Sequence, residues 1–324
     1  MTPTPSPQPP SPEKHSVLLL AHGGPDRLED LPEFLTNVRN GRPAPPELLR
    51  EITRRYSLIG GRSPLKEITL RQAQALQRVL GCGWRVYVGM RNWRPFIHVA
   101  VAEIARDGVR RLVCLCMAPQ NSSLSVGLYR KRLQEAEARA GLDIPIHFIE
   151  SWHSHPLLIQ AFAGLLREKM AALEGQNYAV VFTAHSLPER ILAAADPYDG
   201  QVKETVAEVA ARAQPPHWVF AYQSQGTTEE KWLGPTVEET LEDLRRRGFE
   251  SILVAPIGFV ADHVEVLYDI DIGFQEHARR LGLRLARTES LNDCPEFIAA
   301  LAAVVRAKLA SDPAPDPRPP APVL

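Results

Sequence analysis

The stretch Pro256-Ile-Gly-Phe-Val-Ala-Asp-His-Val-Glu-Val-Leu-Tyr-Asp-Ile-Asp271 follows the apolar run Ser251-Ile-Leu-Val-Ala255, and the rest of the chain is organised around it. The run has the length and composition of a buried strand, and Gly258 marks a turn before a helix. Glu265 and Asp269 are four residues apart and therefore share one face of that helix. Carboxylates near a helix N-terminus gain only about 0.3–1 kcal/mol from the macrodipole, which accounts for one or two of them. The stretch holds more ionisable groups than this effect explains, which favours a buried or metal-facing role for some of them: Asp262, His263, Glu265, Asp269 and Asp271.

A second apolar run, Tyr178-Ala-Val-Val-Phe-Thr183, leads into Ala184-His-Ser-Leu-Pro188. This order places the imidazole of His185 at the carboxyl end of a strand, the edge at which open α/β sheets bind their ligands. An imidazole is a suitable ligand for a transition metal and a base near neutral pH, and a carboxylate is a harder ligand that can also carry a proton. Two protein ligands leave positions open so that a metal can be passed on, whereas a closed site of four would retain it.

Strand-like and helix-like segments alternate along the chain, which predicts parallel sheets covered by helices. The second half echoes the first, because Val17-Leu-Leu-Leu-Ala-His-Gly-Gly-Pro25 resembles Val180-Val-Phe-Thr-Ala-His-Ser-Leu-Pro188. We therefore expect an α/β protein with two Rossmann-like lobes whose parallel sheets face a cleft. The expected strands are 17–20, 84–89, 112–117, 144–149, 178–183, 218–222, 252–256 and 283–286, and helical periodicity is found in 68–81, 97–108, 157–173, 237–248 and 295–305.

The two ends of the chain differ in composition from its centre. Residues 1–14 and 311–324 are rich in proline, and we expect both to be disordered tails. Between them, residues 15–150 are the expected N-terminal lobe and residues 151–310 the expected C-terminal lobe. The last helix, from Pro295, could pack on the N-terminal lobe.

Composition excludes several classes of function. The 324 residues have a formal charge of −1, which argues against nucleic acid or an anionic membrane surface as a partner. No basic leader precedes an apolar core, and no apolar run approaches the roughly 20 residues of a spanning helix. We expect a cytoplasmic monomer without a transmembrane segment. No dinucleotide-binding glycine motif or P-loop occurs, so no organic cofactor is implied.

Cysteines and other histidines have structural explanations. Cys114 and Cys116 alternate within an apolar strand, so they share one face and are expected to be small core residues. His263 and Asp262 are expected to support the site rather than to bind a metal. His153 and His155 are expected to cap the helix that follows them.

A basic segment lies between the first expected strand and helix. It comprises Arg39-Asn-Gly-Arg-Pro43 and Arg54-Arg-Tyr-Ser-Leu-Ile-Gly-Gly-Arg-Ser-Pro-Leu65. Two interpretations stay open at this point. The segment is either a solvated basic surface or a clamp for carboxylates, because a guanidinium group matches a carboxylate with two hydrogen bonds.

Eight short motifs occur in a recognisable order and spacing. They are Arg55-Tyr-Ser-Leu-Ile-Gly-Gly61, Ser63-Pro-Leu65, Tyr87-Val-Gly-Met90, Ser125-Val-Gly-Leu-Tyr129, Ala184-His-Ser-Leu-Pro188, Asp196-Pro-Tyr198, Trp232-Leu-Gly-Pro235 and Gly258-Phe-Val-Ala-Asp-His-Val-Glu-Val-Leu-Tyr-Asp269. Together they resemble the ferrochelatase family, which inserts ferrous iron into a porphyrin, and in particular the bacterial branch that acts on coproporphyrin III. The resemblance covers about residues 17–309.

The resemblance implies a type II chelatase-like fold, Fe²⁺ and a porphyrin as substrates, and a role in haem biosynthesis. It implies that His185 and Glu265 form the catalytic iron site. Some ferrochelatases bind an iron–sulfur cluster through cysteines near the C-terminus, but none follows Cys294 here, so we expect no cluster. The porphyrin contacts that the resemblance implies are His22, Arg39, Arg55, Tyr56, Ser63 and Tyr129.

Two positions depart from the family pattern. His22 stands where this branch commonly has a tyrosine against the porphyrin metal, so axial ligation of the product is an open question. Gly273 stands where a related pattern has a further glutamate, and the nearest acid is Glu276. An auxiliary metal route along the helix is therefore in doubt.

Three alternatives stay open at this stage. The substrate could be protoporphyrin IX, or the chain could insert a metal into another tetrapyrrole. The same scaffold could also serve as a non-catalytic carrier of haem or metal. The pair of His185 and Glu265 favours an enzyme, since a carrier needs pocket walls but no proton acceptor.

Overall fold

The computed structural model describes residues 15–226 and 230–311, and the expected tails fall outside these ranges except for Ser311. Within them, eight parallel strands form two four-stranded sheets, with orders β2-β1-β3-β4 and β6-β5-β7-β8. The last four strands therefore repeat the arrangement of the first four, as the internal echo predicts. The strands are β1 (His15–Ala21), β2 (Trp84–Met90), β3 (Leu112–Cys116), β4 (Ile146–Ile149), β5 (Tyr178–His185), β6 (Trp218–Gln223), β7 (Ser251–Ala255) and β8 (Arg284–Arg287).

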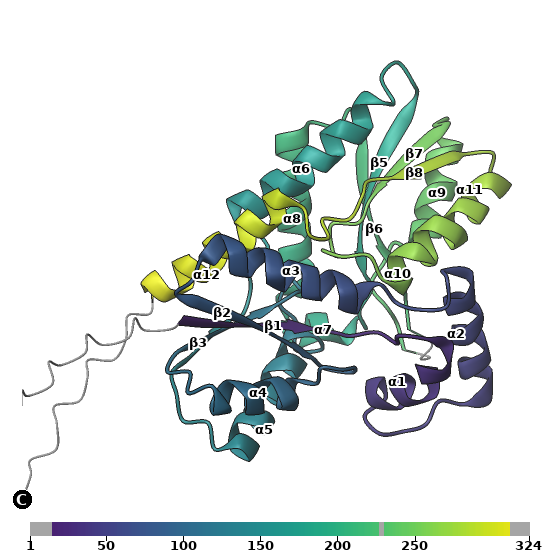
Figure 1. Cartoon of the computed structure of the whole chain (residues 1–324). Coiled ribbons are helices and arrows are strands. Elements are labelled where there is room, and N and C mark those ends of the chain that lie inside the picture. The colour runs from purple at the N-terminus through teal and green to yellow at the C-terminus, as the bar shows by residue number, and fades with distance from the viewer. Residues whose placement is uncertain (1–14, 227–229, 312–324) are drawn as a thin grey trace, which may run out of the picture.

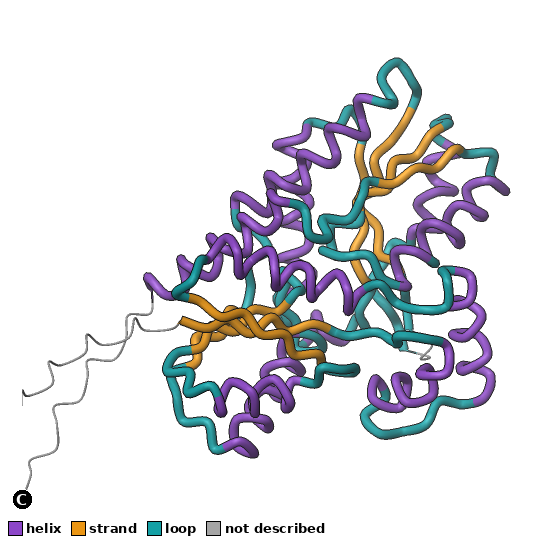
Figure 2. The backbone as a smooth tube through the Cα atoms, in the orientation of Figure 1, coloured by secondary structure: helices purple, strands orange, loops and turns teal. Residues whose placement is uncertain are grey.

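The prediction of two Rossmann-like lobes is confirmed, and each expected strand is present within two residues of its predicted ends. Figure 2 shows the two sheets as separate groups of strands with helices around each. The helices are α1 (Leu31–Val38), α2 (Pro46–Leu58), α3 (Leu65–Leu80), α4 (Ile97–Arg106), α5 (Val126–Ala140), α6 (Pro156–Ala171), α7 (Arg190–Ala193), α8 (Tyr198–Ala213), α9 (Val237–Arg246), α10 (Val264–Leu267), α11 (Gln275–Arg280) and α12 (Pro295–Ser311).

Alternate side chains of the central strand β1 serve the two faces of the first sheet. Leu18 and Leu20 pack under α4 and α5 together with Cys114 and Cys116, so the prediction that these cysteines are core residues is confirmed. On the other face, Val17 belongs to a larger hydrophobic cluster that reaches into the second lobe.

This larger cluster joins the two lobes. It contains Leu19 of the first sheet and Phe182 of the second, with residues of α3, α6, α8 and α12 between them. Helix α12, the last described element, packs against both α6 and α3, and Figure 1 shows it lying across the junction of the lobes. A third cluster covers the outer face of the second sheet with α9 and α11.

Helices α1 and α2 form a small hairpin between β1 and α3. Their apolar residues Phe34, Leu35 and Tyr56 form a separate cluster with Trp93. Val264 of the second lobe packs against this cluster, which places the hairpin next to α10 (Figure 1). In the described part of the chain, no helix combines the length and the apolar character needed to cross a membrane.

The segment after β7 corrects the expectation of one regular helix. A single turn of α10 is followed by a π-helix at Asp269–Phe274 and then by α11. In the π-helix the Gly273 amide donates to the Tyr268 carbonyl oxygen, 2.9 Å away, across five residues. Such wide turns are rare and occur often at functional sites.

Candidate functional site

The carboxyl ends of β5 and β7 carry the two residues that the sequence singles out. His185 is the last residue of β5, and Glu265 lies in the first turn of α10. Their loops touch, because a Cβ atom at Gly258 would lie 2.6 Å from the Cβ of Ala184. The His185 Nε2 and Glu265 Oε1 atoms are 3.4 Å apart. The side chains are 31% and 34% exposed, so a ligand can reach both.

Each member of this pair stabilises the charged form of the other. Burial alone lowers the pKa of His185, but the carboxylate of Glu265 outweighs it and raises the pKa to about 9. Burial alone raises the pKa of Glu265, but His185 and His263 outweigh it and hold that pKa well below its ordinary value. At neutral pH the metal-free site is therefore an imidazolium–carboxylate pair.

Hydrogen bonds hold both residues in place. The Tyr198 hydroxyl donates to the His185 carbonyl oxygen at 2.8 Å, and the Gln223 side-chain amide donates to the Glu265 carbonyl oxygen at 2.8 Å. His263 contacts Glu265 Oε2 through Nε2 at 3.4 Å and the Ala261 carbonyl oxygen through Nδ1 at 3.0 Å. These contacts agree with a supporting role for His263.

His22 follows β1 and approaches the pair from the first lobe. Its Nδ1 atom lies 3.0 Å from the Gly23 carbonyl oxygen, and its Nε2 atom lies 2.9 Å from Nδ2 of Asn92. Burial and the positive charge of Arg91 lower the pKa of His22 to about 4, against the opposing effect of Glu265. His22 is therefore a neutral imidazole at neutral pH, and both of its nitrogens are already engaged.

Two more expected porphyrin contacts are almost fully buried. Tyr56 is 3% exposed, and burial, with the negative charge of Glu265 as a smaller cause, raises the pKa of its phenol. Ser63 is 5% exposed and packs against the loop after β1, where a Cβ atom at Gly24 would lie 2.5 Å from the Ser63 hydroxyl oxygen. Only glycine permits this close approach.

The two expected carboxylate-binding arginines differ in their surroundings. Arg55 already has protein partners: its Nε atom donates to Glu51 at 2.8 Å, and its Nη1 atom lies 3.7 Å from Asp269. Arg39, at the end of α1, has a buried Nε atom without a hydrogen-bond partner among the described residues. Arg39 is therefore the freer of the two to bind an anion.

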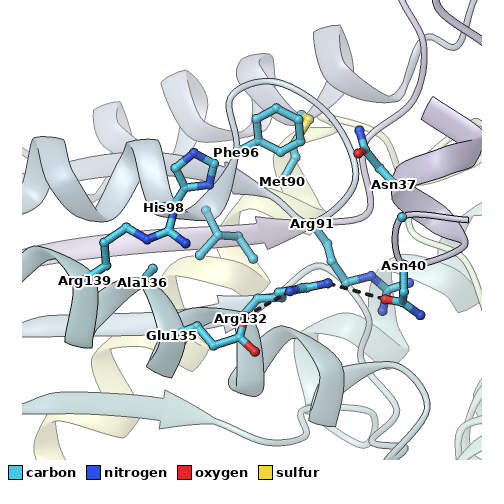
Figure 3. Close-up of a pocket in the computed structure, with 12 residues that line it drawn as sticks. Asn37, Asn40, Met90, Arg91, Phe96, His98, Arg132, Glu135, Ala136 and Arg139 are labelled. Carbon is cyan, nitrogen blue, oxygen red and sulfur yellow. Dashed lines mark hydrogen bonds and ion pairs between the residues drawn. The ribbon is translucent and has the colours of Figure 1, made fainter. Parts of the chain in front are cut away.

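A cationic cavity of about 210 Å³ lies between the α1–α2 loop, the end of β2 and helix α5. In Figure 3, Arg91 and Arg132 both point toward Asn40. The Nη1 atom of Arg91 is buried and has no hydrogen-bond partner within the described ranges, and its guanidinium lies 5.0 Å from the ring centroid of Tyr129. Burial raises the pKa of Tyr129 to about 12. A carboxylate on a ligand would satisfy the unpaired guanidinium group.

Sequence reasoning missed Arg91 and Asn92, although a signal was present. Both follow the motif Tyr87-Val-Gly-Met90 directly, at the carboxyl end of β2. The rule that places His185 at a ligand-binding edge applies equally to them.

A second cavity, of about 370 Å³, lies beside the π-helix. Arg55, Asp269 and Gly273 line it together with Ser224, whose hydroxyl donates to Asp269. Burial raises the pKa of Asp269 to about 6, while Ser224 and Arg55 act in the opposite direction. Gly273 contributes no carboxylate here, as the departure from the family pattern implies.

The two histidines that precede α6, His153 and His155, have different roles in the structure. His155 caps that helix as expected, because its Nδ1 atom accepts from the Leu157 amide at 3.3 Å. The same expectation for His153 is wrong. Its Nε2 atom pairs instead with Glu204 of α8 at 2.8 Å, and its Nδ1 atom contacts the Ser151 hydroxyl.

Two Rossmann-like lobes, with an imidazole–carboxylate pair where the strand ends meet, define a two-lobed metal chelatase. Solved structures agree on the fold. SirB from Bacillus subtilis, determined with Fe³⁺, is 12% identical and superposes with a TM-score of 0.57, over 92% of this chain and 96% of that one. CbiX, described as the terminal enzyme of sirohaem biosynthesis in denitrifying bacteria, is 14% identical and gives a TM-score of 0.51, over 90% of this chain and 98% of that one.

Sequence comparisons identify the family. The Ferrochelatase family model matches residues 14–309. A ferrochelatase of Acidobacterium capsulatum is 45% identical over 94% of this chain and 98% of its own length. A coproporphyrin III ferrochelatase of Halalkalibacterium halodurans is 40% identical over 92% of this chain and 98% of its own length. The chain belongs to the ferrochelatase family, and it is an enzyme that inserts iron into a porphyrin in haem synthesis.

Proposed function

We propose that the porphyrin is coproporphyrin III and that His185 and Glu265 receive the ferrous iron. The observation that carries the assignment of the iron site is the half-exposed pair at the meeting point of β5 and α10, with 3.4 Å between His185 Nε2 and Glu265 Oε1. One imidazole nitrogen and one carboxylate oxygen suit a borderline metal such as Fe²⁺. They also leave coordination positions for water and for the porphyrin nitrogens.

The reaction replaces two pyrrole protons with Fe²⁺, so the site must remove water from the metal and accept protons. A metal ligand must be deprotonated, and Fe²⁺ therefore displaces the proton that His185 shares with Glu265. As the porphyrin nitrogens take over the metal, the imidazole and the carboxylate become free to accept the two pyrrole protons. The fixed position of His185 at a strand end supplies the rigid mounting that ring distortion requires.

The choice of coproporphyrin III rests on cationic groups without protein partners. This porphyrin carries four propionates, whereas protoporphyrin IX carries two propionates and two vinyl groups. Arg39 and Arg91 each have a buried nitrogen without a partner in the described residues, and Arg91 stacks on Tyr129. Additional propionates would satisfy these groups, and vinyl groups would leave them unpaired, which costs about 1–3 kcal/mol for each.

We expect a higher kcat/KM for coproporphyrin III than for protoporphyrin IX, measured with Fe²⁺ under anaerobic conditions. Arg91→Gln should reduce this preference by about 10-fold or more, because a charge-assisted hydrogen bond contributes about 1.5–3 kcal/mol. Arg106→Gln, an exposed arginine on α4, is the matched control and should leave the preference unchanged. Equal efficiency on the two porphyrins, or a preference for protoporphyrin IX, would contradict the choice of substrate but not the chelatase activity.

We further propose that His22 ligates the iron of the product complex. Its neutral imidazole is suited to Fe²⁺, but ligation requires Nε2 to exchange its contact with Asn92 for the metal. His22→Ala should therefore change the visible and EPR spectra of the product complex, and His22→Tyr should give a phenolate-like ferric spectrum. Identical spectra for wild type and the alanine variant in both oxidation states would show that His22 is not a ligand.

A further inference from the structure

The segment 262–271 carries Glu265. The guanidinium group of Arg287, which lies outside the site, pairs with a carboxylate at each end of this segment. Arg287, the last residue of β8, donates from Nε and Nη2 to the two carboxylate oxygens of Asp271, at 2.6 and 2.9 Å. Its Nη2 atom also lies 3.5 Å from Oδ1 of Asp262. Asp262 directly precedes His263, and Asp271 lies within the π-helix, so His263, Glu265 and Asp269 all fall between the two carboxylates.

Arg287 is itself rigidly placed. Its side chain is 13% exposed, and its remaining terminal nitrogen, Nη1, donates to the Thr288 carbonyl oxygen at 3.0 Å. The Thr288 amide in turn donates to the Val254 carbonyl oxygen of β7 at 2.9 Å. The guanidinium group is therefore anchored to the second sheet.

The first of the two carboxylates has further partners. Asp262 accepts from the Ser290 hydroxyl at 2.7 Å and from the Asn292 side-chain amide at 2.9 Å. Asp271 is 36% exposed, and within the described ranges its carboxylate pairs with Arg287 alone. Removing Arg287 therefore leaves the start of the segment anchored and releases the π-helical end.

We propose that Arg287 is a positioning residue that holds the π-helical segment in register, so that Glu265 stays opposite His185. The proposal rests on the function proposed above for that pair. A π-helix is a rare conformation, and a bidentate pair between arginine and carboxylate fixes its position with geometric specificity. The contacts of Arg287 are with Asp262, Asp271 and the Thr288 carbonyl oxygen, so its effect is transmitted through the position of Glu265.

Two measurements on the full chain test this role. Arg287→Gln is expected to lower kcat for Fe²⁺ insertion into coproporphyrin III by about 10-fold or more, the usual loss for an outer partner of a metal site. The KM for the porphyrin should stay within about twofold of wild type, because the porphyrin contacts lie on the first lobe. Hydrogen exchange of the Ile272 and Gly273 amides, which both donate to the Tyr268 carbonyl oxygen, should accelerate by about 10-fold or more, while exchange in β5 stays unchanged.

Matched variants separate positioning from general stability. Arg287→Lys should give an intermediate kcat, because an ammonium group cannot bridge Asp262 and Asp271 as the planar guanidinium does. Arg284→Gln, on the same strand but bonded to Ser251, should behave as wild type. If Arg287→Gln does not fold, Asp271→Asn tests the same contact from the exposed side, and it should reproduce the lower kcat and the faster exchange.

Either of two results would overturn the proposal. One is unchanged exchange of the Ile272 and Gly273 amides in Arg287→Gln or Asp271→Asn. The other is a kcat that falls no further than in Arg284→Gln. If the wild type inserts no iron into coproporphyrin III, the proposed function fails, and the exchange measurement still decides whether Arg287 holds the segment.

Discussion

Replacing His185 with alanine is expected to reduce iron insertion by about 10²–10⁴-fold, the usual effect of losing a general base, while the protein stays folded. The change removes a metal ligand and a proton acceptor at once. It also leaves Glu265 without the partner that lies 3.4 Å from it. Insertion is measured anaerobically from porphyrin absorbance, and porphyrin binding is measured separately by fluorescence quenching.

The matched control for this variant is His217→Ala. His217 is an exposed histidine that directly precedes β6, at the amino end of the same sheet, opposite to His185. It should retain wild-type turnover. Near-normal turnover in His185→Ala would refute the assignment of the iron site, and a loss of the folded state would be visible in its circular dichroism.

Glu265→Gln is expected to lower turnover by about 100-fold or more while changing porphyrin affinity much less. The amide keeps the shape of the carboxylate and its reach toward His185, but it removes the negative charge that raises the pKa of His185 to about 9. It is also a weaker ligand for Fe²⁺ and cannot accept a proton.

Glu276→Gln is the matched control for the second variant. Glu276 is exposed on α11, one turn beyond Gly273, and should tolerate the change. If Glu265→Gln loses porphyrin affinity and nothing else, then Glu265 belongs to the porphyrin site and not to the metal site.

Most strands could be predicted from the sequence because they are short apolar runs, such as Ser251–Ala255 before Pro256. Helices without a strong apolar stripe could not be predicted in this way. In α5 the buried positions are Val126, Tyr129, Leu133 and Ala136, and most of the other residues are charged or small. The α1–α2 hairpin was likewise missed, because its apolar cluster is completed by Trp93 and Val264 from distant parts of the chain.

From the sequence, a site residue could be predicted only where a single distinctive side chain stands at the end of a predicted strand. The strand-end rule indicated His185, but the choice of Glu265 as its partner among the neighbouring acids came from the resemblance to the ferrochelatase family. The pairing of Arg55 with Glu51 was missed because α2 was not predicted, since a spacing of four residues brings the two side chains together only on a helix. The π-helix could not be predicted either, because the pattern after β7 suits an ordinary helix and the contact with Arg287 comes from another strand.

The central claim is that this chain inserts ferrous iron into a porphyrin at the pair of His185 and Glu265. It is tested most directly by mixing the wild-type protein anaerobically with Fe²⁺ and coproporphyrin III and following the visible spectrum, with the His185→Ala/Glu265→Gln double variant beside it. We predict that the four-band spectrum of the free-base porphyrin is converted to that of the iron porphyrin by the wild type only. A free-base spectrum that persists with bound porphyrin, or equal conversion by the double variant, would contradict the account.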